Sequence, residues 1–229
     1  MQKIIVLTGA GISAESGIST FRDAGGLWEG HDVMAVASPE GWERDPEVVL
    51  NFYNERRRQL NTVQPNAAHL AIQKLEEKYE VVVITQNVDD LHERAGSSHI
   101  IHLHGELKKV RSTGTPAYIQ KCDGDILLGD QCQNGYQLRP HIVWFGEMVP
   151  MLEPAIQQCE TGDIFLIIGT SMQVYPAAGL IAYARLGKPI YYIDPHPNIS
   201  HELRLRRNLQ VIEKKASIGV LEVAEQLLK

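Results

Sequence analysis

The chain has 229 residues, which suits one large α/β domain or one domain with a smaller insert. Its formal net charge of -6 argues against binding of a nucleic-acid backbone as the main activity. The first apolar run is too short for a signal peptide, no run approaches the roughly 18 residues of a membrane span, and three cysteines form no even-numbered disulfide framework. We expect a cytoplasmic monomer that binds neither nucleic acid nor membrane.

The opening stretch predicts a buried strand over residues 4–7, a glycine turn and then a helix. Gly9, Gly11 and Ala14 fit the spacing G-x-G-x-x-G/A, in which backbone N–H groups at a helix start face a pyrophosphate. Alone, the motif also fits a tight turn that binds nothing. The loop 19–28 follows, with glycines inside it and an aromatic residue near each end. Loops of this kind often become ordered around a ligand.

The rest of the chain alternates between helical spacing and short apolar runs. Asp45 as N-cap and Pro46 in the first turn predict a helix toward Leu60. Further helices are expected over 66–78, after 86–90, over 176–186 and over 219–228, and strands over 81–85, 100–105, 142–147, 163–168, 188–194 and 209–212. Residues 106–139 lack such periodicity and indicate an insert. The pattern predicts an α/β fold with a Rossmann-like parallel sheet covered by helices and a small inserted module.

Small polar segments follow several predicted strands, at residues 8–11, 86–89, 102–105, 169–171 and 194–195. In open α/β sheets ligands bind at the carboxyl ends of the strands, so these segments are expected to meet in one crevice. A dinucleotide-binding dehydrogenase places an acid about 20 residues after its glycine turn, at the end of a second strand. Asp32 is near that distance but follows no strand, whereas Asp194 ends a strand late in the chain. Hydride transfer is therefore disfavoured.

Seven motifs, in order along nearly the whole chain, resemble those of the sirtuins, a family of NAD-dependent protein-lysine deacylases. They are Gly-Ala-Gly-Ile-Ser at 9–13, Phe-Arg at 21–22, Leu-Trp at 27–28, Gln-Asn-Val-Asp at 86–89, His-Leu-His-Gly at 102–105, Phe-Gly-Glu at 145–147 and Gly-Thr-Ser at 169–171. The resemblance is to the bacterial class III subgroup, the desuccinylases and demalonylases. It implies a Rossmann-like NAD-binding domain over 1–30, 62–105 and 142–229, and a small domain over 31–61 and 106–141, with a helical part and a degenerate zinc-ribbon-like part.

The resemblance implies that NAD is consumed as a co-substrate. It implies cofactor-binding roles for Gly9, Ala10, Gly11, Glu15, Phe21, Arg22, Trp28, Gln86, Asn87, Asp89, Gly169, Thr170, Ser171, Asp194 and Ala216, and catalytic roles for His104, Asn87 and Asp89. In the family's mechanism the acyl-lysine oxygen attacks the ribose carbon and releases nicotinamide. His104 would then act as general base on a ribose hydroxyl, since the pKa of histidine lies near neutral pH. The products would be free lysine, nicotinamide and acyl-ADP-ribose.

The substrate implied is an acylated lysine in an extended protein segment. Val143, Phe145, Gly146 and Glu147 would form a strand-like edge that pairs with its backbone. Trp144 and Phe145 could wall a tunnel for the lysine stem, and for Trp144 a place in the core is an equal alternative.

Tyr53 and Arg56 share a helix face at positions i and i+3, and a phenol beside a guanidinium can receive a carboxylate. Spacing alone also fits a helix with Tyr53 in the core and Arg56 in solvent. The class III subgroup carries this Tyr-x-x-Arg pair, which implies a preference for succinyl or malonyl groups over acetyl.

Many sirtuins bind structural zinc through two Cys-x-x-Cys pairs. Here those positions fall near Ser112, Thr115, Cys132 and Gly135, with Cys122 outside the spacing. Two thiols do not supply four ligands, so we expect no zinc; His102, His104 or Asp130 would have to complete a site. His102 is expected to pack or to hydrogen-bond. Two other functions remain open: NAD-dependent ADP-ribosyl transfer to protein, and NAD binding without turnover.

Overall fold

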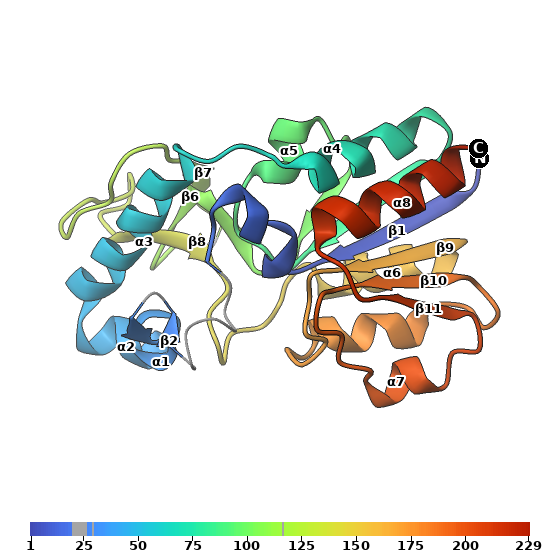
Figure 1. Ribbon diagram of the computed structural model, residues 1–229. Helices are drawn as coiled ribbons and strands as arrows, with labels where there is room; N and C mark the ends of the chain where they lie inside the picture. Colours follow the sequence, from blue (N-terminus) through green and yellow to red (C-terminus); the bar gives the residue numbers. More distant parts are fainter. Residues whose placement is uncertain (20–26, 29, 116) are drawn as a thin grey trace.

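The computed structural model describes residues 1–19, 27–28, 30–115 and 117–229 and has a larger and a smaller lobe (Figure 1). The larger lobe is built on a six-stranded parallel sheet with the order β11-β10-β9-β1-β4-β5. These strands are β1 (Lys3–Thr8), β4 (Glu80–Thr85), β5 (Ile100–His102), β9 (Ile164–Ile168), β10 (Ile190–Ile193) and β11 (Leu209–Ile212). The predicted parallel sheet is confirmed.

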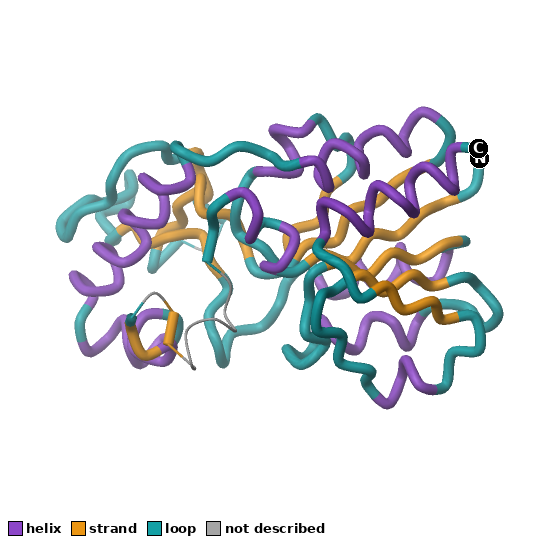
Figure 2. The backbone as a smooth tube through the Cα atoms, in the orientation of Figure 1, coloured by secondary structure: helices purple, strands orange, loops and turns teal. Residues whose placement is uncertain are grey.

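Helices cover both faces of this sheet, as Figure 2 shows. On one face, Ile4 and Val6 pack against α4 (Ala67–Lys74) and α8 (Ala216–Leu228). On the other face, Ile5 and Leu7 contact α6 (Leu152–Thr161) and the 3-10 helix η4 (Ala177–Tyr183). Alternate residues of a strand point to opposite faces, so a strand covered on both sides is apolar throughout.

The smaller lobe combines a helical part with a three-stranded antiparallel sheet of order β7-β6-β8. Its elements are β2 (Leu27–Trp28), β3 (His31–Asp32), α1 (Val33–Val36), α2 (Pro39–Arg44), α3 (Pro46–Leu60), β6 (Gly105–Ser112), β7 (Ile119–Lys121) and β8 (Leu138–Ile142). The Asp45 side chain accepts a hydrogen bond from the Val48 N–H at 3.0 Å and caps α3 as predicted.

Helix α3 also holds the long loop between β7 and β8. The Asn54 side chain donates to the Ile126 carbonyl and accepts from the Ile126 N–H, at 2.8 and 2.9 Å. The Arg57 guanidinium is 1% exposed and donates to the carbonyls of Leu107 and Gly124, at 2.9 and 3.2 Å. The bonds to Ile126 satisfy the backbone of a buried loop residue, and those of Arg57 link the helix to β6 and to the loop.

Four predicted elements are wrong in part. The strand expected over 100–105 ends at His102, and Gly105 begins the antiparallel strand β6. The helix expected after Gly11 is two 3-10 turns, η1 (Ala10–Ile12) and η2 (Ala14–Ser16), ended by left-handed Gly17 at φ 98°. The helix expected over 176–186 is the shorter 3-10 helix η4. The strand expected over 142–147 stops at Ile142, and the chain then turns through Gly146 at φ 88°.

The remaining short helices are η3 (Leu75–Glu77), α5 (Leu91–Ala95) and α7 (His201–Arg204). No helix within the described ranges is long and apolar enough to cross a membrane.

Candidate active site at the carboxyl edge of the sheet

The polar segments that follow the strands meet in one place, as the sequence predicts. The Gln86 N–H, after β4, donates to the Thr8 carbonyl at the end of β1 at 2.9 Å. The Gln86 side chain donates to the Thr170 hydroxyl, after β9, at 2.9 Å. The Gly169 N–H donates to the Ile193 carbonyl at the end of β10 at 3.0 Å. Four strand ends therefore form one continuous polar rim.

The glycines of the first turn lie against the turn that follows β9. A Cβ atom on Gly11 would lie 2.6 Å from the Gly169 Cα, and one on Gly9 would lie 2.8 Å from the Gly169 carbonyl oxygen. Gly169 has φ 60°, a left-handed conformation that favours glycine. The two turns can therefore approach each other only because neither carries a side chain there.

His104 faces this rim from the segment after β5. Its Nδ1 lies 3.0 Å from the Gln86 carbonyl oxygen. A carbonyl oxygen only accepts, so Nδ1 carries the proton and, in the neutral ring, Nε2 keeps its lone pair. Burial lowers the pKa of His104, against the opposing effect of the Gln86 bond. The imidazole is therefore held as a neutral base at neutral pH.

Asn87 and Asp89 are buried and joined through Ser13. The Asn87 amide donates to the Gly9 carbonyl and to the Ser13 hydroxyl, each at 3.2 Å. The Ser13 hydroxyl donates to the Asp89 carboxylate at 2.9 Å. Burial raises the pKa of Asp89, although bonds from the Leu91 N–H and from Ser13 favour the ionised form. The candidate catalytic residues thus form one connected network with the glycine turn.

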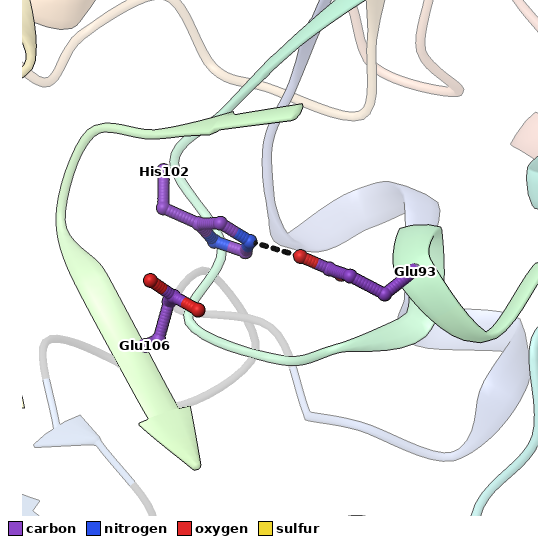
Figure 3. Close-up of side chains that lie close together, drawn as sticks. All are labelled: Glu93, His102 and Glu106. Atoms are coloured by element: carbon purple, nitrogen blue, oxygen red, sulfur yellow. Dashed lines mark hydrogen bonds and ion pairs between the residues drawn. The ribbon is translucent and has the colours of Figure 1, made fainter. Parts of the chain in front are cut away.

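His102, two residues before His104, hydrogen-bonds as expected. Its ring lies beside Glu93 and Glu106 in Figure 3, and potential ligand atoms of the three residues lie within 4.8 Å of one another. Both ring nitrogens of His102 are engaged, one with Glu93 at 2.6 Å and one with the Asn87 carbonyl at 3.2 Å. A metal ligand needs a free nitrogen lone pair, so this arrangement favours an ion pair over a metal site.

Tyr53 and Arg56 are both largely buried, so the helix does not simply place Tyr53 in the core and Arg56 in solvent. Tyr53 is fully buried, and its hydroxyl accepts a hydrogen bond from the Trp144 indole N–H at 3.1 Å. The Arg56 side chain is only 15% exposed, and its guanidinium lies 4.4 Å from the centre of the Phe52 ring. Trp144 is 2% exposed and therefore belongs to the core, whereas Phe145 is exposed.

The segment expected to pair with a substrate backbone follows β8 as an irregular turn. The Val143 N–H donates to the His104 carbonyl at 2.9 Å, which places the segment beside the candidate base. The Glu147 carboxylate accepts from Arg111, Arg139 and the Trp144 N–H, at 2.7, 2.8 and 2.8 Å. This carboxylate therefore fixes the turn.

Several other predicted cofactor residues lie in different parts of the molecule. The Glu15 carboxylate accepts from the Ser217 N–H and hydroxyl, at 3.0 and 2.8 Å, next to Ala216 at the start of α8. Trp28 packs on Phe52 with ring centres 4.9 Å apart, beside the Tyr53 helix. Asp194 is buried after β10. Phe21 and Arg22 lie outside the described residues.

The positions that hold zinc in many sirtuins are joined by hydrogen bonds. The Cys132 thiol donates to the Ser112 hydroxyl at 3.3 Å, and that hydroxyl accepts from the N–H groups of Gly114 and Thr115, at 3.2 and 3.0 Å. The Cys122 thiol donates to the Gly124 carbonyl at 3.3 Å. Ser112 thus occupies the centre of this turn.

Comparison with known proteins gives the family. A family model described as "Sir2 family" matches residues 9–176. The chain belongs to the Sir2 family, the sirtuins. An NAD-dependent protein deacylase of Helicobacter pylori strain J99 is 54% identical over 229 residues, which cover all of this chain and 97% of that protein. A Bacteroides thetaiotaomicron protein of the same name is 54% identical over 234 residues and matches 100% and 99% of the two chains.

Solved structures agree with this sirtuin's fold. A Sir2 homologue in complex with NAD superimposes with a TM-score of 0.88 at 37% identity, covering 99% of this chain and 89% of that one. A Sir2 protein bound to an acetylated peptide gives a TM-score of 0.81 at 28% identity, over 97% and 92%. The rim fits a dinucleotide, since the segments after four strands bring polar side chains and backbone groups together at one edge of the sheet. NAD is the co-substrate of this family.

Two residues of this sirtuin's site lay outside the predicted set. Ser13 was part of a motif, but its link between Asn87 and Asp89 depends on where the 3-10 turns place it. The second residue is Glu93. The spacing of His102 and His104 predicts that they share a side of the strand, but it does not indicate that Glu93, on helix α5, is the partner of His102.

Proposed function

We propose that this enzyme, an NAD-dependent protein deacylase, removes acidic acyl groups such as succinyl and malonyl from lysine in preference to acetyl. The observation that carries the preference is the state of Arg56. Its Nε and Nη1 atoms are buried and have no hydrogen-bond partner among the described residues. Among the same residues, its Nη2 hydrogen-bonds only to the neighbouring Glu55, at 3.4 Å. A buried guanidinium with free donors costs free energy unless an anion binds it.

Tyr53 supplies the second half of a carboxylate receptor. Its hydroxyl accepts from Trp144, so its own proton can be donated to an acyl carboxylate. Burial raises the pKa of Tyr53, which keeps the phenol protonated at physiological pH. A protonated phenol and a guanidinium can bind both oxygens of one carboxylate. An acetyl group has no such oxygens to offer.

The geometry around His104 supports the reaction that the family resemblance implies. The acyl oxygen of the substrate would attack the nicotinamide ribose of NAD, and nicotinamide would leave. His104 Nε2, which the Gln86 bond leaves unprotonated, would remove the proton from a ribose hydroxyl. That hydroxyl would attack the former amide carbon, and addition of one water molecule would release free lysine and give acyl-ADP-ribose. Asn87 and Asp89 would hold the ribose and carboxamide side of the cofactor.

The test compares Arg56→Met with Arg58→Met on the same helix. Arg58 is exposed and pairs with Asp125, so its loss is a matched control for removing one positive charge. Loss of a charge-assisted hydrogen bond costs about 2 kcal/mol, or about 30-fold. We expect Arg56→Met to lower kcat/KM on a succinyl-lysine peptide by about that factor, with less than about threefold change on the acetyl-lysine peptide. Arg58→Met should leave both unchanged.

If Arg56→Met lowered kcat/KM equally on both peptides, the preference for acidic acyl groups would be refuted, but the deacylase activity would not. Transfer of ADP-ribose to a target protein, seen as added mass without loss of acyl groups, would instead replace the deacylase assignment.

A further inference from the structure

The imidazole of His102 lies between two acceptors at the end of β5. Nδ1 is 3.2 Å from the Asn87 carbonyl oxygen, and Nε2 is 2.6 Å from the Glu93 carboxylate, the dashed contact in Figure 3. The carbonyl only accepts, and a contact of 2.6 Å to a carboxylate is that of a charge-assisted bond. Both nitrogens therefore carry protons, and His102 is an imidazolium.

The surroundings favour this charge. Burial alone would lower the pKa of His102, but the Glu93 bond and charge, with Glu106 behind them, raise it above the usual value. Glu106 comes from β6 and pairs with Lys109 at 2.7 Å, and Asp89 adds a further negative charge from the loop. Two other histidines, His92 on α5 and His141 on β8, lie near enough to interact with the charge of His102. Burial lowers the pKa of both, so they stay neutral at neutral pH.

Loss of one proton from His102 must break one of its two contacts. A neutral imidazole has a single N–H group. If Nδ1 keeps it, the Nε2 lone pair faces the Glu93 carboxylate. If Nε2 keeps it, the Nδ1 lone pair faces the Asn87 carbonyl. Only the imidazolium can connect Glu93 on α5 with the backbone of Asn87.

The contact between His102 and the Asn87 carbonyl affects the site through the position of the Asn87 backbone. The Asn87 side chain donates to Gly9 and Ser13, so its orientation depends on where its backbone is held. His104 holds the preceding carbonyl, that of Gln86. Two histidines thus bond the carbonyls of two consecutive residues, one as a neutral ring and one as a cation.

We propose that His102 is a positioning residue whose imidazolium fixes Asn87, so that NAD binding weakens when His102 loses its proton. The inference rests on the proposed use of NAD by this site. It gives the two histidines opposite pH dependences: protonation of His104 removes the base at low pH, whereas deprotonation of His102 loosens the cofactor site at high pH.

The test measures kcat and KM for NAD between pH 6 and pH 9.5 with saturating succinyl-lysine peptide, and the Kd of NAD by calorimetry at the same pH values. The wild type should show an increase in KM and Kd on the alkaline side. Glu93→Gln keeps the shape but removes the charge, so its increase should begin about one pH unit lower. His102→Gln cannot titrate, so its KM should be raised several-fold at pH 7 and flat with pH, with kcat within about threefold.

Glu153→Gln is the matched control, because Glu153 is an exposed glutamate on α6. Its pH profile should match the wild type. The proposal would be overturned if KM and Kd for NAD began to increase at the same pH in Glu93→Gln as in the wild type. It would also be overturned if they still increased at alkaline pH in His102→Gln. NAD binding by calorimetry needs no turnover, so a protein that binds NAD with this pH profile but removes no acyl group would contradict only the proposed function.

Discussion

The Nδ1 atom of His104 lies 3.0 Å from the carbonyl oxygen of Gln86, and this one contact decides which nitrogen of the ring can act as a base. Because the proton must sit on Nδ1, a substrate hydroxyl can meet only Nε2. The strand ladder between β4 and β5 places the two residues together: it pairs Thr85 with His102, and His104 follows two residues later.

The first prediction concerns this base. General base catalysis contributes about 10²- to 10⁴-fold, so His104→Ala should lower kcat on acyl-lysine peptides by at least about 100-fold. Burial lowers the pKa of His104, so the neutral ring persists below the usual histidine value and the acid limb of kcat/KM should lie below about pH 6.5. A pH–rate profile checks this. An acid limb well above pH 6.5 would contradict the assignment of His104.

The second prediction concerns the contact between the two glycine turns. Gly11→Ala would place a Cβ against the Gly169 backbone, where nothing flexible can move aside. Overpacking of this kind costs about 2 kcal/mol, so urea unfolding should show that loss together with weaker NAD binding. Gly124→Ala is the control, since a Cβ there meets nothing within 4 Å. Equal stability of the two variants would be inconsistent with close contact of the turns.

The third prediction concerns two buried histidines behind the site. His69 and His92 pack with ring centres 4.9 Å apart, and burial lowers the pKa of both, that of His69 to about 4. The unfolded chain takes up these protons near pH 6.5, whereas the folded chain resists them, so stability falls as the pH falls from 6.5 toward 4.

For His69 alone, this difference in proton uptake lowers the free energy of unfolding by about 2 kcal/mol between pH 7 and pH 5. In His69→Gln, where the amide oxygen can still accept from the Asn66 N–H, this part of the acid sensitivity should disappear. Urea titrations at the two pH values measure the difference. An unchanged difference in the variant would show that His69 is protonated in the folded state.

The fourth prediction concerns the turn around Ser112. Its hydroxyl meets the Cys132 thiol and two backbone N–H groups, so we expect a chelator to leave the Tm unchanged. Ser112→Ala should cost about 1 kcal/mol, because two part-buried N–H groups lose their acceptor. Metal analysis of the purified protein gives an independent check, and one zinc per chain would refute the expectation.

The sheet and its rim could be predicted because they depend on local patterns. A strand buried on both faces is apolar throughout, and the carboxyl ends of parallel strands meet, so residues 8–11, 86–89 and 169–171 were placed together from sequence. The fate of the segments after the strands could not be predicted in the same way. Gly17 ends the first turns in a left-handed conformation, and the Glu147 carboxylate bonds the Trp144 N–H. The left-handed turn at Gly17 and the hydrogen bond of Glu147 each stand where the composition favours a regular helix or strand.

The same distinction between local patterns and long-range contacts applies to the site residues. Motifs indicate which side chains are present, so Gln86, Asn87 and His104 could be named as candidates, and their roles stay predictions. The hydrogen bonds that orient them come from residues far apart in the chain, as Ser13 and Glu93 do. Periodicity carries no information about such partners.

Helix α3 has a consequence for how this enzyme could diverge. Its Asn54 and Arg57 side chains secure the loop of the small lobe. Between them in the chain lies Arg56, whose Nε and Nη1 have no hydrogen-bond partner among the described residues. One helix therefore carries both the side chains that secure the lobe and the proposed receptor for the acyl carboxylate. A shift of α3 that made room for a longer acyl chain would also strain the loop. Variation in substrate preference is accordingly expected to arise through exchange of single side chains on α3, with the helix kept in place.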